Sequence, residues 1–321
     1  MEKWFKYYDK KRVIVTGGAG FICSHLVEKL LDLGADVTVI DSMLCGNKIA
    51  YLKGKRGLKV HKLDIVDYES IAPFFNKADI VFHLAAVVGV EETQMDPLHV
   101  LDVEIIGTAN VIKLSALNRV KKYVFASSSE VYGDSKKPMV EKGPYSPRST
   151  YALTKLVGEH YCQAYFQKYG MEYVVLRYFN CYGPRQDERF VLSRFVDRAK
   201  NGLYLPVYGD GNQTRDFTYV EDAVHMSLLA AASPSGINQE FNIGTNRTVS
   251  INTLAEMILK ALKATNKVRI KHVAYDKLRS RKIEIFNRLA NINKAIGLLD
   301  YEPSTPLEVG IKKYISWYNK N

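Results

Sequence analysis

The sequence contains no long apolar segment. A membrane-spanning helix needs roughly 20 consecutive apolar residues, and no run in this chain approaches that length. The stretch from Met1 to Arg12 also lacks the uninterrupted apolar core and the small-residue cleavage site of a signal peptide. We therefore expect no membrane association and a cytoplasmic location.

Cysteine is scarce and scattered. The chain has 4 cysteines, without a Cys-x-x-Cys spacing and without a nearby pair of histidines. They are Cys23, Cys45, Cys162 and Cys181. This distribution argues against a disulfide framework and against a zinc site, so we expect reduced thiols and no metal.

A concentrated block of one charge is missing as well. The 45 lysines and arginines exceed the 34 acidic residues and give a net charge of +11, which favours anionic partners such as nucleic acid or a phosphorylated small molecule. The basic residues are spread along the chain and do not alternate with aromatics in one patch. This spread disfavours nucleic acid as a partner. An ordinary solvated surface explains the positive net charge as well as an anionic partner does.

The first motif follows a short basic lead-in. Residues 12–16 form a β-branched strand, a glycine turn follows, and residues 24–33 have the apolar spacing of a helix. Gly17 permits a tight turn, and Gly20 lets the backbone approach a pyrophosphate at the helix N-terminus. Cys23 replaces the last glycine of the usual pattern, so we expect the helix to lie slightly farther from the strand. This order is the context that a dinucleotide-binding fingerprint requires.

Carboxylates follow the next strands. Asp41 ends the strand of residues 36–40, about 20 residues beyond the glycines, where a carboxylate accepts hydrogen bonds from ribose hydroxyls and repels a 2′-phosphate. This position favours NAD over NADP. Asp64 and Ile65 follow a strand at residues 58–63. His83, in the strand of residues 79–86, we interpret as structural because it lies between apolar neighbours.

Strands and helices alternate as far as residue 178. This alternation indicates an α/β fold with a Rossmann-type, doubly wound parallel sheet. From residue 186 the elements become shorter and richer in arginine, the side chain suited to a bidentate grip on phosphate. We expect a cofactor-binding domain at residues 1–185 and a smaller mixed α/β substrate lobe at residues 186–321.

The central stretch is the start of a helix expected at residues 151–169. Tyr151 and Lys155 stand four residues apart and therefore project from one face. A neighbouring ammonium lowers the pKa of a phenol, which would make Tyr151 a base near neutral pH. The alternative is a chance pair on an exposed helix. Before it, Ser127, Ser128, Ser129 and Glu130 follow another strand, and such polar groups are costly to bury without a purpose.

Together these stretches resemble the extended short-chain dehydrogenase/reductase family, in its nucleotide-sugar epimerase/dehydratase branch. The resemblance covers residues 16–22, 41, 64–65, 83–86, 127–133, 151–155 and 176–180, and also residues 207–217 and 290–303. One departure is Glu104, four residues before Thr108, where relatives often carry asparagine.

The resemblance implies a role for each matching residue. Lys155 would hold the nicotinamide ribose, and Tyr151 would take the proton of the sugar 4-hydroxyl with Ser128 as its hydrogen-bond partner. The implied NAD contacts are Gly17, Gly20, Phe21, Ile22, Asp41, Asp64, Ile65 and Ala85. The implied substrate contacts are Ser129, Asn180, Arg215, Arg281 and Arg288, of which Asn180, Arg215 and Arg281 would hold the diphosphate of a nucleotide-diphosphate sugar.

Oxidation of carbon 4 to a ketone would open three reactions. If the ketone takes the hydride back on its other face, the product is the 4-epimer. If carbon 5 bears a carboxylate, the ketone loses carbon dioxide. If a base removes the carbon 5 proton, water leaves from carbon 6. Glu130 favours the last two, Arg281 favours the epimerase, and Ser129 stands where well-equipped dehydratases carry aspartate. We place the 4-epimerase first, with the decarboxylase and the dehydratase as alternatives.

Two further expectations remain. The family pairs the helices at residues 102–117 and 151–169 with those of a second copy, so we expect a homodimer; Tyr161, Tyr165 and Phe166 would then form part of the interface or simply pack on the sheet. A catalytically silent module that binds NAD or RNA is the alternative of another class, but the intact set of Tyr151, Lys155 and Ser128 argues against it.

Overall fold

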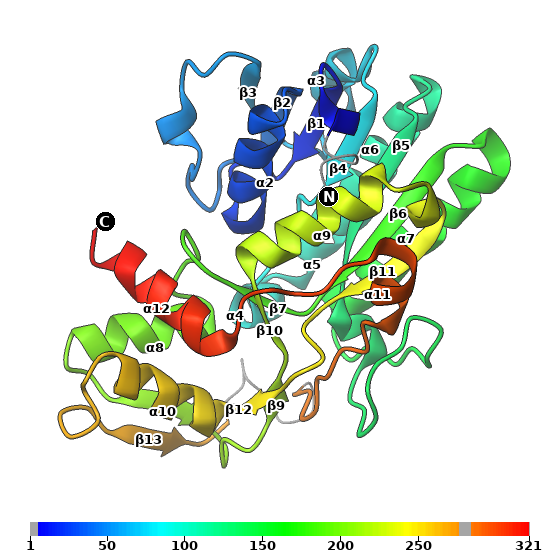
Figure 1. Ribbon diagram of the computed structural model, residues 1–321. Coiled ribbons are helices and arrows are strands. Elements are labelled where there is room, and N and C mark those ends of the chain that lie inside the picture. The colour runs from blue at the N-terminus through cyan, green and yellow to red at the C-terminus, as the bar shows by residue number, and fades with distance from the viewer. Residues whose placement is uncertain (1–5, 276–283, 321) are drawn as a thin grey trace.

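The protein is described here by a computed structural model, which covers residues 6–275 and 284–320. Seven parallel strands form one central sheet in the order β11-β6-β5-β4-β1-β2-β3 (Figure 1). The strands are β1 (Arg12–Thr16), β2 (Asp36–Asp41), β3 (Leu58–Lys62), β4 (Ile80–His83), β5 (Lys122–Ser128), β6 (Glu172–Tyr178) and β11 (Gln239–Ile243). Their inner members are buried on both faces, as β-branched runs in a parallel sheet require.

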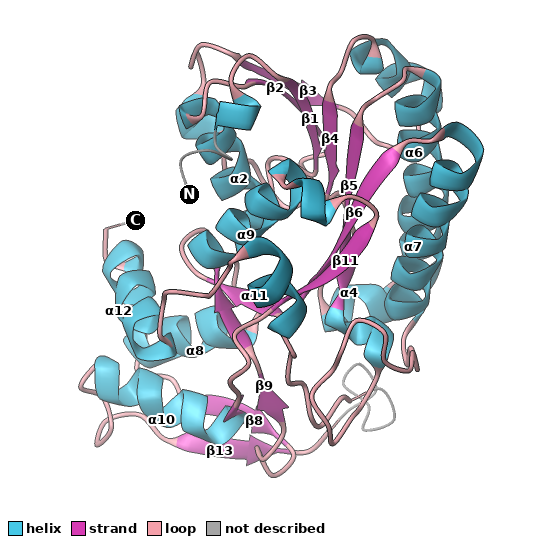
Figure 2. Cartoon of the chain, turned by 45° about the vertical axis from the view of Figure 1, so that its right-hand side comes forward, coloured by secondary structure: helices cyan, strands magenta, loops and turns pink. Residues whose placement is uncertain are grey.

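Helices cover both faces of the sheet (Figure 2). One face carries α2 (Phe21–Asp32), α9 (Val220–Ala232) and α11 (Asn293–Leu299) over one apolar core. The other carries α3 (Tyr68–Ile71), α6 (Thr108–Leu117) and α7 (Thr150–Tyr169) over a second core. The Rossmann-type doubly wound sheet expected from the sequence is therefore confirmed.

Smaller sheets and helices lie below the central sheet in Figure 1 and enclose a separate core. The strands pair as β7 (Asn180–Tyr182) with β10 (Phe217–Tyr219), β8 (Leu205–Tyr208) with β13 (Ile270–Val273), and β9 (Thr214–Arg215) with β12 (Val249–Ser250). The helices are α8 (Val191–Lys200), α10 (Ile251–Ala261) and α12 (Leu307–Tyr318).

Short helical segments complete the described chain. The α-helical ones are α4 (Val90–Met95) and α5 (Pro97–Leu101). The 3-10 turns are η1 (Lys6–Tyr8), η2 (Ala50–Leu52), η3 (Ala72–Phe75), η5 (Ser129–Tyr132) and η6 (Pro234–Gly236). Between α5 and α6, residues Asp102–Gly107 (η4) form a π-helical turn.

The structure differs from the expected elements in two places that matter for the site. The helix expected at residues 24–33 begins earlier, at Phe21, so its first turn directly follows the glycines. The single helix expected at residues 102–117 is divided into η4 and α6. A π-helical turn holds one residue more than the regular repeat, so it changes the directions of the side chains on that segment.

The chain crosses between the two regions more than once. β11 pairs with β6 at the edge of the central sheet, and α9 packs on α2. Residues 220–243 therefore lie with the first region, although the sequence suggested that everything after residue 185 forms the second lobe. The separate core of the second region supports two lobes, and their boundary remains a prediction.

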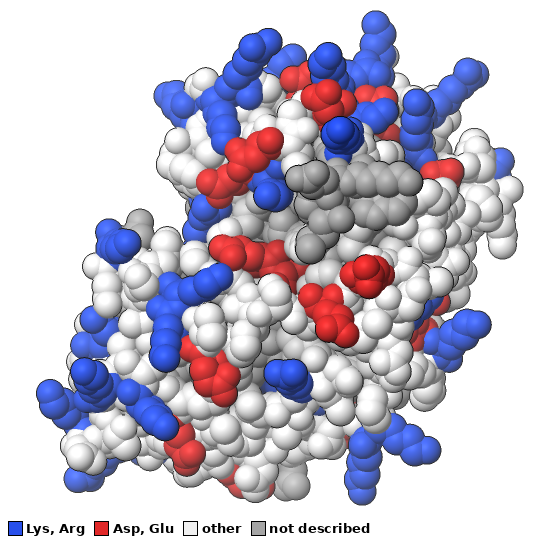
Figure 3. Space-filling view, in the orientation of Figure 1, with Lys and Arg blue, Asp and Glu red and all other residues white. Residues whose placement is uncertain are grey.

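Within the described ranges no helix is both long and apolar enough to cross a membrane. The four cysteines are unpaired. On the face shown in Figure 3, lysines and arginines project singly around the outline, with acidic residues between them. The described residues on this face therefore form no continuous basic patch of the kind that nucleic acid binds.

A candidate active site at the carboxyl edge of the sheet

A cavity of about 750 Å³ lies where the carboxyl ends of the strands face the second region. In parallel α/β sheets this edge is where ligands bind. The expected residues found in its lining are Gly17, Gly20, Phe21, Ile22, Asp41, Asp64, Ile65, Ala85, Ser128, Glu130, Tyr151, Lys155, Asn180, Arg215 and Arg288. The fold thus brings together residues that are up to 271 positions apart in the sequence, from Gly17 to Arg288.

The part of the cavity next to β1 fits a dinucleotide. Gly17 has φ of +70°, and a Cβ atom there would lie 2.8 Å from the backbone of Ala85. Gly20 precedes the first turn of α2 and offers no side-chain cap, which leaves that turn open to an anion. Asp41 accepts hydrogen bonds from the backbone N–H groups of Ala19 (2.9 Å) and Met43 (2.6 Å), so its carboxylate is fixed at the cavity wall.

Cys23 belongs to the core beneath this loop. Its side chain is buried, and burial raises the pKa of the thiol well above its ordinary value. A buried, protonated thiol is inert, so Cys23 acts here as a small packing residue between α2 and the sheet.

Tyr151 lies in the first turn of α7. Ser149 caps this helix, since its hydroxyl oxygen accepts a hydrogen bond from the N–H of Ala152 at 3.1 Å. The hydroxyl of Ser128, from the end of β5, lies near enough to the phenol of Tyr151 to lower its pKa. The ammonium of Lys155 lies 5.4 Å from the centroid of the Tyr151 ring. The spacing predicted from the sequence therefore places the three side chains in one cluster.

The pKa of Tyr151 differs from the expectation. Burial raises the pKa of Tyr151 well above its ordinary value, and the carboxylates of Glu104 and Glu130 raise it further, whereas Ser128 lowers it. The sequence suggested a lowered pKa because Lys155 is near. In the structure Lys155 is paired with Glu104 at 2.8 Å, and this second carboxylate offsets the effect of the ammonium.

His83 has the structural role that the sequence suggested. Its Nδ1 lies 2.7 Å from the hydroxyl of Thr16, and its Nε2 lies 3.0 Å from the hydroxyl of Thr108. Burial, with a contribution from Lys155, lowers the pKa of His83 to about 3. The imidazole is therefore neutral at physiological pH and ties β4 to β1 and α6.

Glu130 and Arg288 face each other beside Tyr151. An Nη2 atom of Arg288 lies 3.6 Å from Oε1 of Glu130, and Ser149 donates a hydrogen bond to Oε2 at 3.1 Å. Within the described ranges, Nε of Arg288 is buried without a hydrogen-bond partner. A buried donor without a partner is costly, so it marks a position that suits an anionic ligand group.

Three residues were expected to hold the diphosphate of the substrate, and only two of them lie within the described part of the chain. Asn180 lines the cavity, and its Oδ1 is buried without a partner in the described part of the chain. Arg215 also lines it, but its guanidinium is paired with Glu284 and donates to the carbonyl oxygens of Thr214 and Ile285. Arg281 lies outside the described residues.

Ser129 is a correction to the expected site. It is 1% exposed and does not line the cavity, because the turn η5 that begins at Ser129 directs its side chain into the protein. The cavity is also lined by Arg189, Arg194 and Lys48, for which the sequence indicated no individual role. The arginine-rich composition after residue 186 was their only signal, and it does not distinguish lining residues from surface residues.

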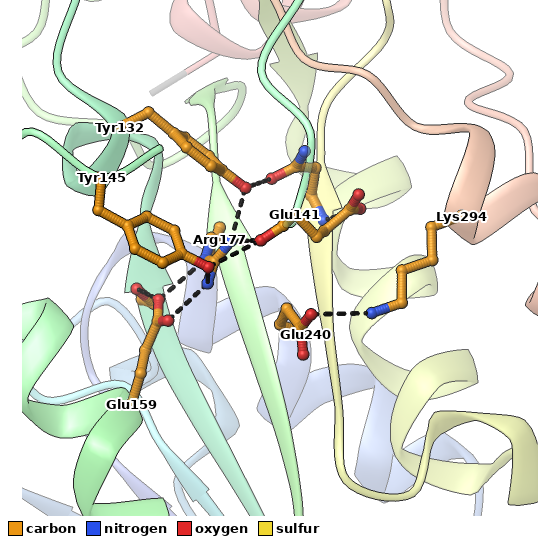
Figure 4. Close-up of polar contacts among 9 residues, drawn as sticks. Tyr132, Glu141, Tyr145, Glu159, Arg177, Glu240 and Lys294 are labelled. Carbon is orange, nitrogen blue, oxygen red and sulfur yellow. Dashed lines mark hydrogen bonds and ion pairs between the residues drawn. The ribbon is translucent and has the colours of Figure 1, made fainter. Parts of the chain in front are cut away.

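A buried polar network around Arg177 joins β6, α7 and the turn η5 (Figure 4). Arg177 on β6 donates two hydrogen bonds to Glu159 of α7, at 2.9 and 2.6 Å, and further ones to the hydroxyls of Tyr132 and Tyr145. Ser127 donates to the same Glu159 at 2.5 Å. The network therefore fixes the end of β5, the loop before α7, and α7 itself relative to one another.

Known proteins match nearly the whole chain. A family model described as the NAD dependent epimerase/dehydratase family matches residues 13–244. A UDP-N-acetyl-alpha-D-glucosaminuronate decarboxylase from Bacillus cytotoxicus is 36% identical over 97% of this chain and 98% of its own length. A putative UDP-glucose 4-epimerase from Methanocaldococcus jannaschii is also 36% identical, over 96% of this chain and 99% of its own.

A solved structure also matches the fold of nearly the whole chain. The UDP-glucuronic acid 4-epimerase of Bacillus cereus, in complex with UDP-4-deoxy-4-fluoro-glucuronic acid and NAD, is 29% identical with a TM-score of 0.89, and the match covers 96% of this chain and 99% of that one. These proteins match the same chain over most of its length, yet they are named for different reactions, so the reaction of this chain has to be argued from its own residues.

Proposed function

The chain belongs to the NAD-dependent epimerase/dehydratase family, and within this family we propose that it oxidises carbon 4 of the sugar in a nucleotide-diphosphate sugar. The cluster of Tyr151, Ser128 and Lys155 in one cavity with the dinucleotide loop carries this proposal. A binding module without activity has no need of a phenol in the cavity beside a buried ammonium. The enzyme uses NAD, whose site is the glycine loop with Asp41 at its wall.

Tyr151 takes the proton of the sugar 4-hydroxyl in this proposal. Ser128 hydrogen-bonds the reacting oxygen or the phenol and favours the ionised form of Tyr151. NAD, when bound, accepts the hydride that leaves carbon 4. The proton on oxygen and the hydride on carbon together account for the oxidation of the alcohol to a ketone.

The pair of Glu130 and Arg288 decides between the later reactions. A plain 4-epimerase returns the hydride to the carbon that lost it and needs no second pair of charges at the site. Here a carboxylate and a guanidinium are held beside Tyr151, and the guanidinium keeps one buried donor for a ligand. These features favour a sugar that carries a carboxylate on carbon 5, bound by Arg288.

We therefore place decarboxylation of a nucleotide uronate ahead of the 4-epimerisation that the sequence alone favoured. In the 4-keto uronate the carboxylate is β to the ketone, so the bond between carbon 5 and the carboxyl carbon breaks and its electron pair moves toward the ketone oxygen. Carbon 5 then needs a proton, which comes from water and which Glu130 relays to the carbon. Return of the hydride to carbon 4 completes the reaction without net oxidation.

The 4-epimerase remains the second candidate, favoured by the relative named as a putative UDP-glucose 4-epimerase. Asn180 and Arg215 would hold the diphosphate in either reaction. Glu284 pairs with Arg215, so a diphosphate has to displace the carboxylate of Glu284 before it can bind the guanidinium of Arg215.

Product masses test the proposal directly. The purified protein is incubated with UDP-, dTDP-, GDP- and CDP-linked hexoses and with UDP-uronates, and the products are analysed by mass spectrometry. We expect a uronate to lose carbon dioxide and the product to take up deuterium at carbon 5 in deuterium oxide. A product of unchanged mass without deuterium identifies a 4-epimerase, loss of water identifies a dehydratase, and no product with any sugar contradicts the proposed function.

We also propose a homodimer formed through α6 and α7. These helices lie side by side, and α7 exposes Leu153, Phe166 and Tyr169 while α6 exposes Leu117 at its end. Tyr161 and Tyr165 are partly buried and pack on the core below the helices, so they contribute less to the outer face than the sequence suggested. Exposed apolar side chains on a two-helix layer suit pairing with a second copy.

A further inference from the structure

Glu104 is a buried carboxylate with no part in the proposed reaction. It lies in the π-helical turn η4, and its side chain is 1% exposed. Its Oε1 accepts a hydrogen bond from the backbone N–H of Val87 at 3.0 Å, and its Oε2 lies 2.8 Å from the ammonium of Lys155. One side chain thus joins the loop after β4, the turn η4 and helix α7 at the centre of the site.

The position of Glu104 depends on the π-helical turn. Extra-residue turns of this kind occur inside helices mostly at functional sites, because they redirect a side chain without ending the helix. The segment runs without a break from α5 through η4 to α6, and Glu104 is directed from it to Lys155. The turn and the ion pair are two separate observations that indicate a role beyond packing.

Among the residues that the structure describes, Glu104 is the charged side chain paired with Lys155. The side chain of Lys155 is 1% exposed, and its ammonium otherwise lies over the rings of Phe125 and Tyr151. His83 is nearby on β4, but it is neutral because its pKa is lowered to about 3 by burial. The cluster of Lys155, Glu104 and the Tyr151 phenol therefore has no net charge before Tyr151 ionises.

We propose that Glu104 is the fixed counter-ion of Lys155 and sets how readily Tyr151 gives up its proton, which makes it a positioning residue. This inference rests on the proposed role of Tyr151 as the base. Loss of the Tyr151 proton gives the buried cluster a net negative charge when Glu104 is present. With a neutral residue at position 104, the same loss takes the cluster from one positive charge to zero, which burial favours.

The other charged groups around Tyr151 are the same whether position 104 carries glutamate or a neutral residue. Glu130 on η5 opposes ionisation, whereas Arg288 and the hydroxyl of Ser128 at the end of β5 favour it. A variant at position 104 changes none of these contacts.

The experiment compares Glu104→Gln with Glu104→Asp and the unchanged protein. Tyrosine labelled with carbon-13 at Cζ reports ionisation in the cofactor-free protein, and the signal of Tyr151 is identified by its absence in Tyr151→Phe. We expect the signal in Glu104→Gln to titrate at least about one pH unit lower than in the unchanged protein. The acid limb of the pH profile of kcat/KM should move in the same direction. Glu104→Asp keeps the charge and should titrate close to the unchanged protein.

Equal titration of Tyr151 in Glu104→Gln and the unchanged protein would overturn the inference, as would titration at higher pH. If Glu104→Gln does not fold, the double variant with Lys155→Met should fold again, because it removes both buried charges. A double variant that also fails to fold would likewise overturn the inference. The titration needs no substrate, so absence of turnover with every sugar refutes the proposed function while leaving this result readable.

Discussion

The buried guanidinium of Arg177 allows a quantitative prediction. Arg177 is 1% exposed, and its contacts are Glu159, the hydroxyls of Tyr132 and Tyr145, and the carbonyl oxygen of Glu141. Arg177→Met keeps much of the side-chain volume and removes all of these hydrogen bonds. It also leaves Glu159, which is 5% exposed, without its cation.

Breaking a buried ion pair by removal of one partner costs about 3 to 5 kcal/mol. We expect Arg177→Met to lower the free energy of unfolding by about 4 kcal/mol, which is a large share of the stability of an ordinary protein. Urea unfolding followed by circular dichroism measures the change as a lower midpoint with an unchanged slope. Turnover should fall too, because Ser127, which precedes Ser128 at the end of β5, donates a hydrogen bond to the same Glu159.

The matched control is Arg177→Met combined with Glu159→Gln. The double variant removes the uncompensated charge, so it should be more stable than Arg177→Met alone by about 1 kcal/mol or more. A loss below about 1 kcal/mol in the single variant would refute the argument, since it would mean that water or another group replaces the cation at no cost.

Three further predictions concern the site and the assembly. Tyr151→Phe should lower kcat by roughly two orders of magnitude or more while the melting temperature stays within a few degrees, and near-normal turnover would show that another group is the base. Asp41→Asn should weaken the preference for NAD over NADP, measured by titration of both cofactors; an unchanged ratio would mean that the carboxylate does not face the ribose. Leu153→Glu should give a monomeric mass in light scattering at micromolar concentration, whereas a monomer already in the unchanged protein would reject the dimer.

The sequence predicted the framework well because its signals are local. Strand β1 and its glycine turn, the end of β2 at Asp41 and the start of α7 near Tyr151 each depend on a short run of residues with one periodicity. The cavity lining follows from these elements, because parallel strands bring their carboxyl ends to one edge. Most of the expected cofactor and catalytic side chains therefore meet without any further information.

The electrostatics of the site was not predictable in the same way. Glu104 was noted only as an unusual residue, and its contact with Lys155 depends on a π-helical turn that has no simple sequence pattern. The raised pKa of Tyr151 follows from that contact and from burial, neither of which a spacing of four residues reveals. Ser129 was misplaced because neighbouring residues in a 3-10 turn point in different directions.

The return of β11 to the central sheet has a consequence for how the protein is made. Strand β6 gains its outer neighbour only when residues 239–243 have been synthesised, and the core on that face includes residues of α9. Even the N-terminal turn depends on this late segment, since the hydroxyl of Tyr8 donates a hydrogen bond to the carbonyl oxygen of Leu228 at 2.6 Å. A nascent chain that ends near residue 185 has an open sheet edge and half of a core, so it stays prone to aggregation until most of the chain has left the ribosome.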